Sequence, residues 1–414
     1  MEKRVVITGM GALTSIGNNL EVFWKNAQAG ISGTDLISKF DVSEYSSQVA
    51  AEVKDFDPTA YIDKKEAKKM DPFVQYAIAA SDMALDDSQL PLDQIDKTRA
   101  GVLVGSGMGG LQTLEAQHKN LLEKGHRRVS PFFIPMQIIN LAPGQICIRY
   151  GFQGANFSVT TACATGAHAV GEAFRWIQRG NMDIMLVGGS EATITPLAVA
   201  GFANMKALST RNDDPTRCSR PFDKDRDGFV IGEGAGILIL ESLDHARARN
   251  ARIYAELIGY AATADAYHIT SPDPEAKGVS LCMQNAINDA GVAPEDVSYI
   301  NAHGTSTPFN DKFETLAIKK VFNSHANRLA ISSTKSMVGH TLGAAGAIEL
   351  ITTALAVKHD IVPPTINYET PDPDCDLDYV PNNARSMSVN IAISNSFGFG
   401  GTNACIMLKK YTEE

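Results

Sequence analysis

Short apolar runs that end at a glycine recur along the chain, and they constrain its fold more than any other feature. Three runs in the first half span residues 5–8, 102–104 and 184–187, and the glycines that follow them are Gly9, Gly105 and Gly188. Their length and their content of Val, Ile and Leu are typical of strands buried on both faces of a sheet. Such a sheet needs helices on both faces, so the pattern predicts an α/β protein.

A helical stretch between two of these runs supports the α/β prediction. In residues 164–179, apolar side chains recur at helical spacing, and Gly180 stands where a glycine ends many helices. The second half repeats this order, with predicted strands at residues 297–301, 329–332, 389–394 and 404–408 and a predicted helix at residues 343–357. At about 150 residues per domain, the length also suggests two or three units. We therefore expect two similar α/β halves, residues 1–250 and 251–414.

One segment of the second half does not fit the strand and helix pattern. Residues 362–383, VPPTINYETPDPDCDLDYVPNN, contain too many prolines for a helix or a central strand. We expect an ordered loop here, with a linker as the alternative.

The composition excludes several classes of protein. The chain has 37 Lys and Arg against 47 Asp and Glu, and a net charge of −10 does not suit binding to nucleic acid through phosphate contacts. Its six cysteines include no C-x-x-C pair, so we expect no zinc ribbon, no disulfide scaffold and a reducing compartment. No signal peptide is recognisable, and no run approaches the roughly 18 apolar residues of a membrane span. The expected location is the cytoplasm, or an organelle stroma or matrix if a transit peptide was removed.

Two motifs begin like ligand-binding signatures and do not complete them. Residues 105–110, GSGMGG, fit G-x-G-x-x-G, but no acidic residue follows on a second strand about 20 residues later, as a dinucleotide site requires. Residues 223–228, DKDRDG, open like a calcium-binding loop, but position 12 is Gly234 and not Glu. We expect a close-packed turn in the first segment, a charged turn in the second, and no resident metal.

Cys163 differs from the other five cysteines because it lies where a predicted strand meets a predicted helix. The β-branched SVTT comes shortly before it, and the small residues ATGA follow it. The N–H groups and the dipole at a helix N-terminus lower the pKa of a thiol, favour the thiolate and can hold an oxyanion. Cys163 is therefore a candidate nucleophile, and a buried, unreactive cysteine is the alternative.

Two histidines lie in glycine-rich turns that follow predicted strands. His303 is in NAHGTSTP and His340 is in KSMVGHTLGAAGA, and α/β sheets place functional loops at such positions. Their spacing matches no zinc motif. Catalysis is the prediction and two core histidines are the alternative. A third loop, NSFGFGGTN at residues 395–403, can bring backbone N–H groups to a carbonyl oxygen or can be a plain tight turn.

These segments together resemble the β-ketoacyl-acyl carrier protein synthases, above all those of the synthase II type, which elongate chains in fatty acid synthesis. The resemblance is carried by TACATG, NAHGTSTP, KSMVGHTLGAAGA and NSFGFGGTN, and it extends from VVITGMGALTSIG to PPTINYETPDPDCDLDYVP. It implies a thiolase-like, five-layered αβαβα fold of two related halves and a homodimer. The implied reaction condenses acyl-acyl carrier protein with malonyl-acyl carrier protein, with loss of carbon dioxide, to give 3-oxoacyl-acyl carrier protein.

The resemblance also implies a role for each motif. Cys163 would take up the acyl group, and the backbone N–H groups of Cys163 and Phe399 would hold the oxyanion. His303 and His340 would donate hydrogen bonds to the malonyl thioester oxygen as carbon dioxide leaves. Lys335 would tune this histidine site, and Phe399 would move as the acyl chain arrives. Two histidines favour an elongating synthase over the initiating Cys-His-Asn enzymes and over thiolases.

Further residues would contact the substrate or an ion. The residues implied in substrate binding are Met108, Thr305, Thr307, His268, Thr270 and Glu349. Of these, Thr305 and Thr307 would contact the phosphopantetheine arm, and Glu349 would also hold Lys335. Met108 departs from the family, which usually has a branched aliphatic residue at this end of the acyl pocket, so no chain length is predicted. The resemblance implies no cofactor of the protein's own, but it places a monovalent cation near Asn301, Glu349 and Ser394.

Local basic residues would dock the acyl carrier protein, which is acidic. The residues concerned are Lys64, Lys65, Lys68, Lys69, Arg127, Arg128 and Lys206. In YIDKKEAKKMD, the lysines four apart share one face of a predicted helix. A solvated charged face is the simpler interpretation of such a run, but local complementarity can steer a partner toward a protein that is acidic as a whole.

Two other functions stay open at this point. One is a thiolase-fold acyltransferase, or a chain-length or initiation factor, that does not condense. The other is a protein that binds the acyl carrier protein without catalysing a reaction. Only the basic residues support this second function. The presence of Cys163 counts against an initiation factor that has lost its nucleophile.

Overall fold

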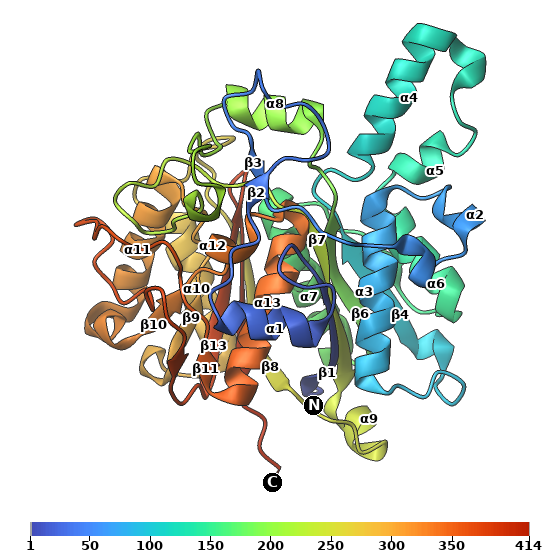
Figure 1. Cartoon of the computed structure of the whole chain (residues 1–414). Coiled ribbons are helices and arrows are strands. Elements are labelled where there is room, and N and C mark those ends of the chain that lie inside the picture. The colour runs from blue at the N-terminus through green and yellow to red at the C-terminus, as the bar shows by residue number, and fades with distance from the viewer. Residues whose placement is uncertain (1, 414) are drawn as a thin grey trace.

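One large twisted sheet receives strands from both halves of the chain in the computed structural model, which describes residues 2–413 (Figure 1). Across the sheet the strand order is β10-β9-β13-β14-β8-β1-β7-β6-β4-β5. The strands of the sheet are β1 (Val5–Leu13), β4 (Ala100–Gly105), β5 (Asn156–Phe157), β6 (Ile184–Glu191), β7 (Gly234–Ser242), β8 (Ala255–Ala264), β9 (Tyr299–Asn301), β10 (Ala330–Ser332), β13 (Ile391–Gly398) and β14 (Thr402–Lys409).

The helices and the short strand pairs complete the described elements. The helices are α1 (Leu20–Gln28), α2 (Lys64–Ala67), α3 (Pro72–Ser88), α4 (Leu111–Lys124), α5 (Phe133–Gln137), α6 (Leu141–Tyr150), α7 (Thr165–Gln178), α8 (Pro196–Asn204), α9 (Leu243–Ala248), α10 (Lys277–Ala290), α11 (Pro308–Phe322), α12 (Lys335–Val338) and α13 (Ala345–His359). The short pairs are β2 (Asp35–Leu36) with β3 (Val49–Ala50) and β11 (Ile361–Val362) with β12 (Arg385–Ser386).

The two halves of the large sheet repeat one topology. In the first half, β7 pairs antiparallel with both β1 and β6. Strand β4 pairs parallel with both β6 and β5. In the second half, β8 and β14, and β14 and β13, pair antiparallel, while β13, β9 and β10 run parallel. The halves meet where β1 pairs antiparallel with β8. The boundary at residue 250, which lies between α9 and β8, stays a prediction.

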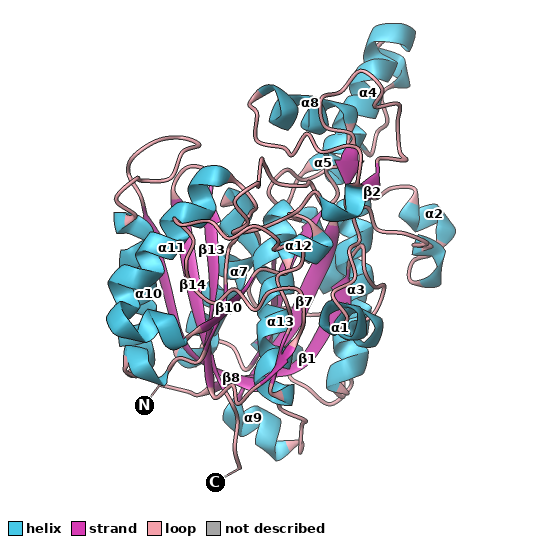
Figure 2. Ribbon diagram, turned by 60° about the vertical axis from the view of Figure 1, so that its left-hand side comes forward, coloured by secondary structure: helices cyan, strands magenta, loops and turns pink. Residues whose placement is uncertain are grey.

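Three layers of helices enclose the two half-sheets. Helices α7 and α13 pack between the half-sheets, α3 and α6 cover the outer face of the first, and α10 and α11 cover the outer face of the second (Figures 1 and 2). Each of the three helical layers has its own cluster of buried apolar side chains. This is the thiolase-like, five-layered αβαβα arrangement that the resemblance implies.

Helices α7 and α13 touch through residues without bulky side chains. A Cβ atom on Gly346 of α13 would lie 2.6 Å from the backbone nitrogen of Ala167 in α7, and one on Gly166 would lie 2.8 Å from that of Ala347. Larger side chains would push the two helices apart. This close approach brings together the turns that precede the helices, one with Cys163 and the other with His340.

The structure confirms the main elements predicted from the sequence and corrects one of them. The predicted strands are present, and the helix at residues 164–179 ends before Gly180, whose φ is +75°. Residues 362–383 form an ordered loop. Asp223, which lies outside the loop, holds it by accepting hydrogen bonds of 2.7 Å from the N–H groups of Glu369 and Thr370.

The helix predicted for the lysine-rich segment is shorter than expected. Helix α2 ends at Ala67, so Lys68 and Lys69 lie beyond it and the lysine pairs do not share a helix face. The chain must leave the helix here because Asp71 caps the next helix and Pro72 begins it, and a proline disfavours helical backbone in the residue before it. Within residues 2–413, none of the helices is long and apolar enough to cross a membrane.

Candidate active site

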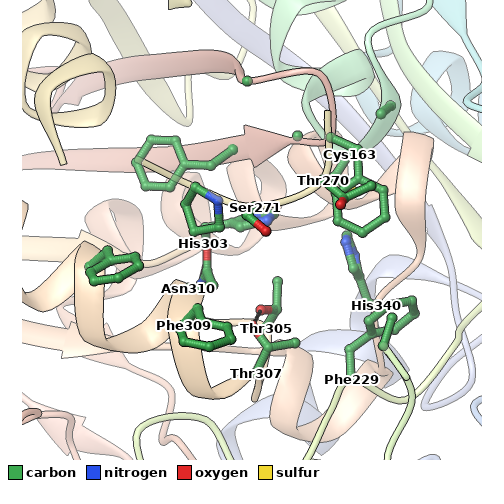
Figure 3. A pocket seen from close by; sticks show the side chains of 18 of the residues that line it. Cys163, Phe229, Thr270, Ser271, His303, Thr305, Thr307, Phe309, Asn310 and His340 are labelled. Carbon is green, nitrogen blue, oxygen red and sulfur yellow. Dashed lines mark hydrogen bonds between the residues drawn. The ribbon is translucent and has the colours of Figure 1, made fainter. Parts of the chain in front are cut away.

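A cavity of about 560 Å³ lies at the ends of the strands where the two halves meet. Residues from both halves line it, among them Cys163, His303, His340 and Phe399. Figure 3 shows His303 and His340 on opposite sides of the space below Cys163. The fold thus brings together the three side chains expected to react, even though Cys163 and His340 are more than about 170 residues apart in the sequence.

The turn that carries Cys163 is strained. Ala162, the residue before it, has a φ of +50°, a conformation that costs a residue with a side chain free energy and that recurs at functional sites. A hydrogen bond of 2.8 Å from the N–H of Thr161 to Oγ1 of Thr165 braces the turn. Cys163 therefore lies in a short 3₁₀ turn that leads directly into α7.

The thiol of Cys163 is less acidic than the sequence suggested. Burial raises its pKa to about 11, and this effect outweighs the opposing effects of the Lys335 charge and of a hydrogen bond from the N–H of Phe399. This direction is opposite to the lowered pKa expected from the sequence, because burial disfavours the thiolate.

The hairpin between β13 and β14 holds a second N–H group beside the sulfur. The backbone N–H of Phe399 donates to Sγ of Cys163. A Cβ atom on Gly398 would lie 2.8 Å from the oxygen of Thr161 and 3.2 Å from the nitrogen of Cys163, so only glycine allows this approach. Oγ1 of Thr402 fixes the hairpin by donating to the oxygen of Thr161 at 3.0 Å. The N–H groups of Phe399 and Cys163 can therefore act together on one oxyanion.

His303 and His340 form a buried pair of neutral rings. Their ring centroids are 5.4 Å apart with an angle of 85° between the planes. Burial, and then the charge of Lys335, keep the pKa of both rings well below its ordinary value. A neutral imidazole carries one N–H, so each ring can donate one hydrogen bond to a substrate oxygen at neutral pH.

Lys335 sets the orientation and the tautomer of His303. Its Nζ donates to the backbone oxygen of His303 at 2.7 Å and lies 3.3 Å from Nδ1 of the ring. Because an ammonium group can only donate, Nδ1 accepts and the ring hydrogen sits on Nε2. Lys335 is 1% exposed and pairs with Glu349, whose pKa is raised to about 7 by burial despite that pairing.

The residues expected to bind substrate divide into two groups. Met108, His268, Thr270, Thr305 and Thr307 line the cavity. The hydroxyl oxygens of Thr305 and Thr307 are 2.9 Å apart, and Figure 3 shows the two side chains beside each other.

Glu349, expected among the same contacts, does not lie on the described cavity wall, and neither does Lys335. Both are buried behind His303, where the ammonium group of Lys335 and the carboxylate of Glu349 form an ion pair. Their effect on a substrate would pass through the histidine.

Several buried polar atoms among and near the residues expected to hold a cation have no hydrogen-bond partner in the described structure. Asn301 of β9 and Ser394 of β13 are paired residues of neighbouring strands and are both buried. In the part of the chain that the structure describes, both side-chain polar atoms of Asn301, Oε2 of Glu349 and Oγ of Ser396 are buried without a hydrogen-bond partner. These oxygen donors suit a hard monovalent cation or water.

The basic residues expected to dock the carrier protein are exposed, except for the half-buried Lys69, and they differ in their surroundings. Lys206 lines the mouth of the cavity, while Arg127 and Arg128 follow α4. Lys69 pairs with Glu66 at 2.7 Å and lies over the ring of Phe132, 5.4 Å from its centroid. These positions do not test the docking role, which stays a prediction.

Sequence reasoning missed two buried carboxylates that hold the loops of the site. Glu314 accepts hydrogen bonds from the N–H groups of His303 at 2.9 Å and Gly304 at 2.8 Å. Glu191 accepts from the N–H groups of Gly107 and Met108, at 2.8 and 3.2 Å. Neither lies in a recognisable motif, and Glu191 is 84 residues from Gly107 along the chain, so no local pattern could mark the contact.

These contacts also explain the two incomplete motifs. In GSGMGG, the N–H groups of Gly107 and Met108 donate to the carboxylate of Glu191, and the segment is the close-packed turn that was expected. In DKDRDG, Asp223 binds backbone N–H groups of the ordered loop, and Asp227 accepts a hydrogen bond of 3.0 Å from the N–H of Thr210. The described residues contain no group of three or more His, Cys, Asp or Glu placed to hold a metal ion.

Comparisons with known proteins agree with this geometry. Family models described as "Beta-ketoacyl synthase, N-terminal domain" and "Beta-ketoacyl synthase, C-terminal domain" match residues 2–246 and 254–369. Proteins named 3-oxoacyl-[acyl-carrier-protein] synthase 2 from Synechocystis sp. and Staphylococcus aureus are each 54% identical to the chain, over 410 and 409 residues, and the one from Coxiella burnetii is 52% identical over 411. Each alignment covers 99% of both chains.

Solved structures show the same similarity. A β-ketoacyl synthase from Burkholderia phymatum superposes with a TM-score of 0.92 at 35% identity, covering 99% of this chain and 100% of that one. The ketosynthase of a type II polyketide system, solved in complex with its acyl-carrier protein and bound to a hexaketide, superposes with a TM-score of 0.91 at 36% identity over the whole of both chains.

Proposed function

The chain belongs to the β-ketoacyl synthase family, and from this we propose that Cys163, His303 and His340 carry out the elongating condensation of fatty acid synthesis. An acyl group and a malonyl group, each on an acyl carrier protein, become a 3-oxoacyl group on one carrier and carbon dioxide. The observation that carries the proposal is the convergence of these three side chains and the N–H of Phe399 on one cavity.

In the first half-reaction, Sγ of Cys163 attacks the acyl thioester carbonyl. The new C–S bond forms as the carbonyl oxygen takes up negative charge, which the N–H groups of Cys163 and Phe399 stabilise. The bond to the carrier sulfur then breaks. Because the thiol is neutral at rest, its proton leaves as the attack proceeds and ends on the departing phosphopantetheine thiol. The acyl chain remains on Cys163.

In the second half-reaction, the malonyl thioester oxygen lies between the two histidine rings. Nε2–H of His303 and an N–H of His340 donate to it, so that the electrons released with carbon dioxide are stabilised on an enolate. The enolate carbon attacks the acyl carbonyl, the C–S bond to Cys163 breaks, and the thiolate takes up a proton from solvent. Lys335 acts through His303 by holding its tautomer.

Selective variants test the assignment of the two half-reactions. Cys163→Gln is expected to abolish condensation and to leave decarboxylation of malonyl-acyl carrier protein measurable, because both histidines remain. His340→Ala is expected to lower decarboxylation while Cys163 still becomes acylated. A decarboxylation rate unchanged in His340→Ala would remove that residue from the mechanism.

The acyl carrier protein is proposed to dock at the cavity mouth. Lys206 lies at the cavity wall, and the exposed side chains of Met205 and Phe309 add an apolar rim. The other basic residues proposed to contact the carrier are Lys64, Lys65, Lys68, Lys69, Arg127 and Arg128. The homodimer implied by the family, and a location in the cytoplasm, belong to the same proposal. Sedimentation of the purified protein tests the dimer, and a monomer at all concentrations would contradict it.

A monovalent cation is proposed to bind at Asn301, Ser394 and Glu349. The buried oxygen atoms of Asn301 and Glu349 without partners among the described residues fit such an ion, which would favour the ionised form of Glu349 that pairs with Lys335. Thermal unfolding in potassium or sodium chloride is compared with unfolding in the salt of a bulky organic cation at the same ionic strength. Binding raises the midpoint with the small cation only, and Asn301→Leu removes the difference. Equal midpoints for the wild type would exclude the ion.

A further inference from the structure

Glu191 is a fully buried carboxylate to which the condensation mechanism assigns no task. It ends β6 and has no exposed surface. Four hydrogen bonds converge on it, from donors in two parts of the molecule. Oε1 accepts from Oγ of Ser106 at 2.9 Å and from the N–H of Met108 at 3.2 Å. Oε2 accepts from the N–H groups of Gly107 at 2.8 Å and Gly343 at 2.9 Å.

These four donors belong to two turns that both contribute residues to the cavity wall. The first is the Gly105–Gly110 turn, which places Gly107 and Met108 on the cavity wall. The second is the His340–Gly343 turn, which places His340 and Leu342 there, the latter with a strained φ of +47°. A Cβ atom on Gly343 would lie 2.3 Å from the nitrogen of Gly107, so the two backbones are in contact.

Glu191 is therefore the shared anchor of both turns. Oε2 joins Gly107 of the first half to Gly343 of the second, while Oε1 fixes the backbone of Met108. Without it, Gly107, Met108 and Gly343 would face a buried site with unpaired N–H groups, at a cost that favours a different arrangement of the turns. The position of Met108 relative to the His340 turn depends on this one carboxylate.

We infer that Glu191 is a positioning residue for acyl-chain selection, since it holds the backbone of Met108 in place at the wall of the cavity. The inference rests on the proposed function, because it concerns which acyl groups the same site accepts. The preference for acyl chains of one length then depends on the backbone position of the Gly105–Gly110 turn as well as on the side chain of Met108.

The substitution Glu191→Gln separates the two ends of this anchor. A glutamine keeps the shape but has one acceptor oxygen and one NH₂ group. The amide oxygen can replace Oε2 and keep the bonds from Gly107 and Gly343. The NH₂ group then takes the place of Oε1, where it can donate to Oγ of Ser106 but faces the N–H of Met108. The variant should therefore loosen Met108 and leave the His340 turn in place.

The test compares kcat/KM of wild type and Glu191→Gln for acyl carriers of short, medium and long chain, together with decarboxylation of malonyl-acyl carrier protein in the absence of acyl groups. We expect the ratio of kcat/KM between long and short chains to change by about tenfold, the scale of one hydrogen bond to a charged group. Decarboxylation should fall by a smaller factor than this ratio changes, because the bond from Gly343 in the His340 turn is kept. A folded variant with an unchanged ratio would overturn the inference.

A matched control separates positioning from general loss of stability. Glu52 is also a buried carboxylate with neutral donors only, since it accepts from the N–H and Oγ of Ser38 at 3.0 and 2.6 Å, and it does not line the described cavity. Glu52→Gln should leave the chain-length ratio unchanged, and an equal change there would overturn the inference.

A second variant covers the case in which Glu191→Gln does not fold. Ser106→Ala removes one donor to Oε1 and also the acceptor for the N–H of Gly109, so it loosens the same turn and should shift the ratio in the same direction by a smaller factor. No shift would again contradict the inference. Wild-type protein without any condensation product would instead contradict the proposed function.

Discussion

At the residue scale, the site depends on how burial distributes charge among a few groups. Lys335 is the buried cation beside the histidine pair, and its charge lowers the pKa of His303, His340 and Cys163 together. Glu349 partly offsets that charge from behind. Two neutral rings therefore face a neutral thiol in the resting site, and negative charge develops only as the reaction proceeds.

The state of Cys163 predicts how its reactivity depends on pH. With a pKa raised to about 11 by burial, the thiolate fraction should rise about tenfold for each pH unit between about pH 7 and about pH 10. Alkylation of the Cys163 peptide by iodoacetamide, followed by mass spectrometry, measures this fraction. A rate that levels off below about pH 9 would show a thiol pKa lower than burial implies and would contradict this prediction.

Loss of the Lys335 charge should disturb the histidine pair. In Lys335→Met, the pKa of both rings rises toward the ordinary value, because one of the two main causes of its depression is removed. Protonation then reaches the rings at a higher pH, and the acid limb of the decarboxylation profile moves to higher pH. The rate should also fall by about a hundredfold or more, since His303 loses the group that fixes its tautomer.

Lys358→Met is the control for that experiment. Lys358 donates to a backbone oxygen, that of Ile253, at 3.0 Å and does not line the described cavity. It should leave the profile unchanged. An unchanged profile in Lys335→Met would mean that burial alone keeps the rings neutral.

The candidate nucleophile and histidines could be predicted from the sequence because each lies in a local motif. TACATG, NAHGTSTP and KSMVGHTLGAAGA contain the reacting residue and the small residues that make its turn. The pKa of Cys163 could not be predicted in the same way, because it depends on how completely distant segments close over the sulfur. The anchors Glu191 and Glu314 were missed for the same reason.

At the scale of secondary-structure elements, the β13–β14 hairpin controls the distance between the two N–H groups that would hold the oxyanion. Its Gly398 packs against Thr161 and Cys163 without room for a side chain. Gly400, two residues further, has a φ of +84° and an open surrounding, so a side chain there strains the backbone without touching the nucleophile.

This difference predicts unequal effects of two alanine substitutions in the hairpin. Gly398→Ala should push the N–H of Phe399 away from the sulfur and slow acylation of Cys163 by about a hundredfold, the scale of one lost oxyanion donor. Gly400→Ala should lower stability by about 1 kcal/mol and affect acylation far less. Single-turnover acylation measured by mass spectrometry checks both. Equal losses in the two variants would assign the effect to hairpin flexibility.

The apolar runs and the glycines that end them predicted most strands and the two central helices. The extent of α2 was not predicted correctly. The lysine spacing alone indicated a longer helix, but the cap at Asp71 and the proline after it end the segment sooner. A local pattern predicts an element well where burial selects it, as in β4 and β6, and poorly where a neighbouring element sets its end.

At the scale of the whole molecule, the acidic net charge of −10 coexists with a basic residue, Lys206, at the cavity wall. The sequence could predict two similar halves, but it could not show that β1 and β8 join their strands into one sheet across residues 5–7. That pairing depends on contacts between segments that are about 250 residues apart in the sequence.

Charge reversal tests the docking side of the molecule. In Lys65→Glu with Lys69→Glu, KM for the carrier protein should rise by about tenfold at low salt while kcat stays near the wild-type value, because the encounter is weakened and the chemistry is not. The effect should fade as ionic strength rises. Lys25→Glu with Lys409→Glu changes the net charge equally at other exposed positions. The same rise in KM for both pairs would place docking elsewhere or reduce it to net charge.

The account depends most on Cys163 as the residue that carries the acyl group between the two half-reactions. Incubating the protein with acyl-acyl carrier protein and digesting it for mass spectrometry measures this directly. We predict the mass of one acyl group on the Cys163 peptide, and its loss when malonyl-acyl carrier protein is added, with carbon dioxide and 3-oxoacyl product released in equal amounts. Product formed without acylation of Cys163, or an acyl group on another residue, would contradict the account.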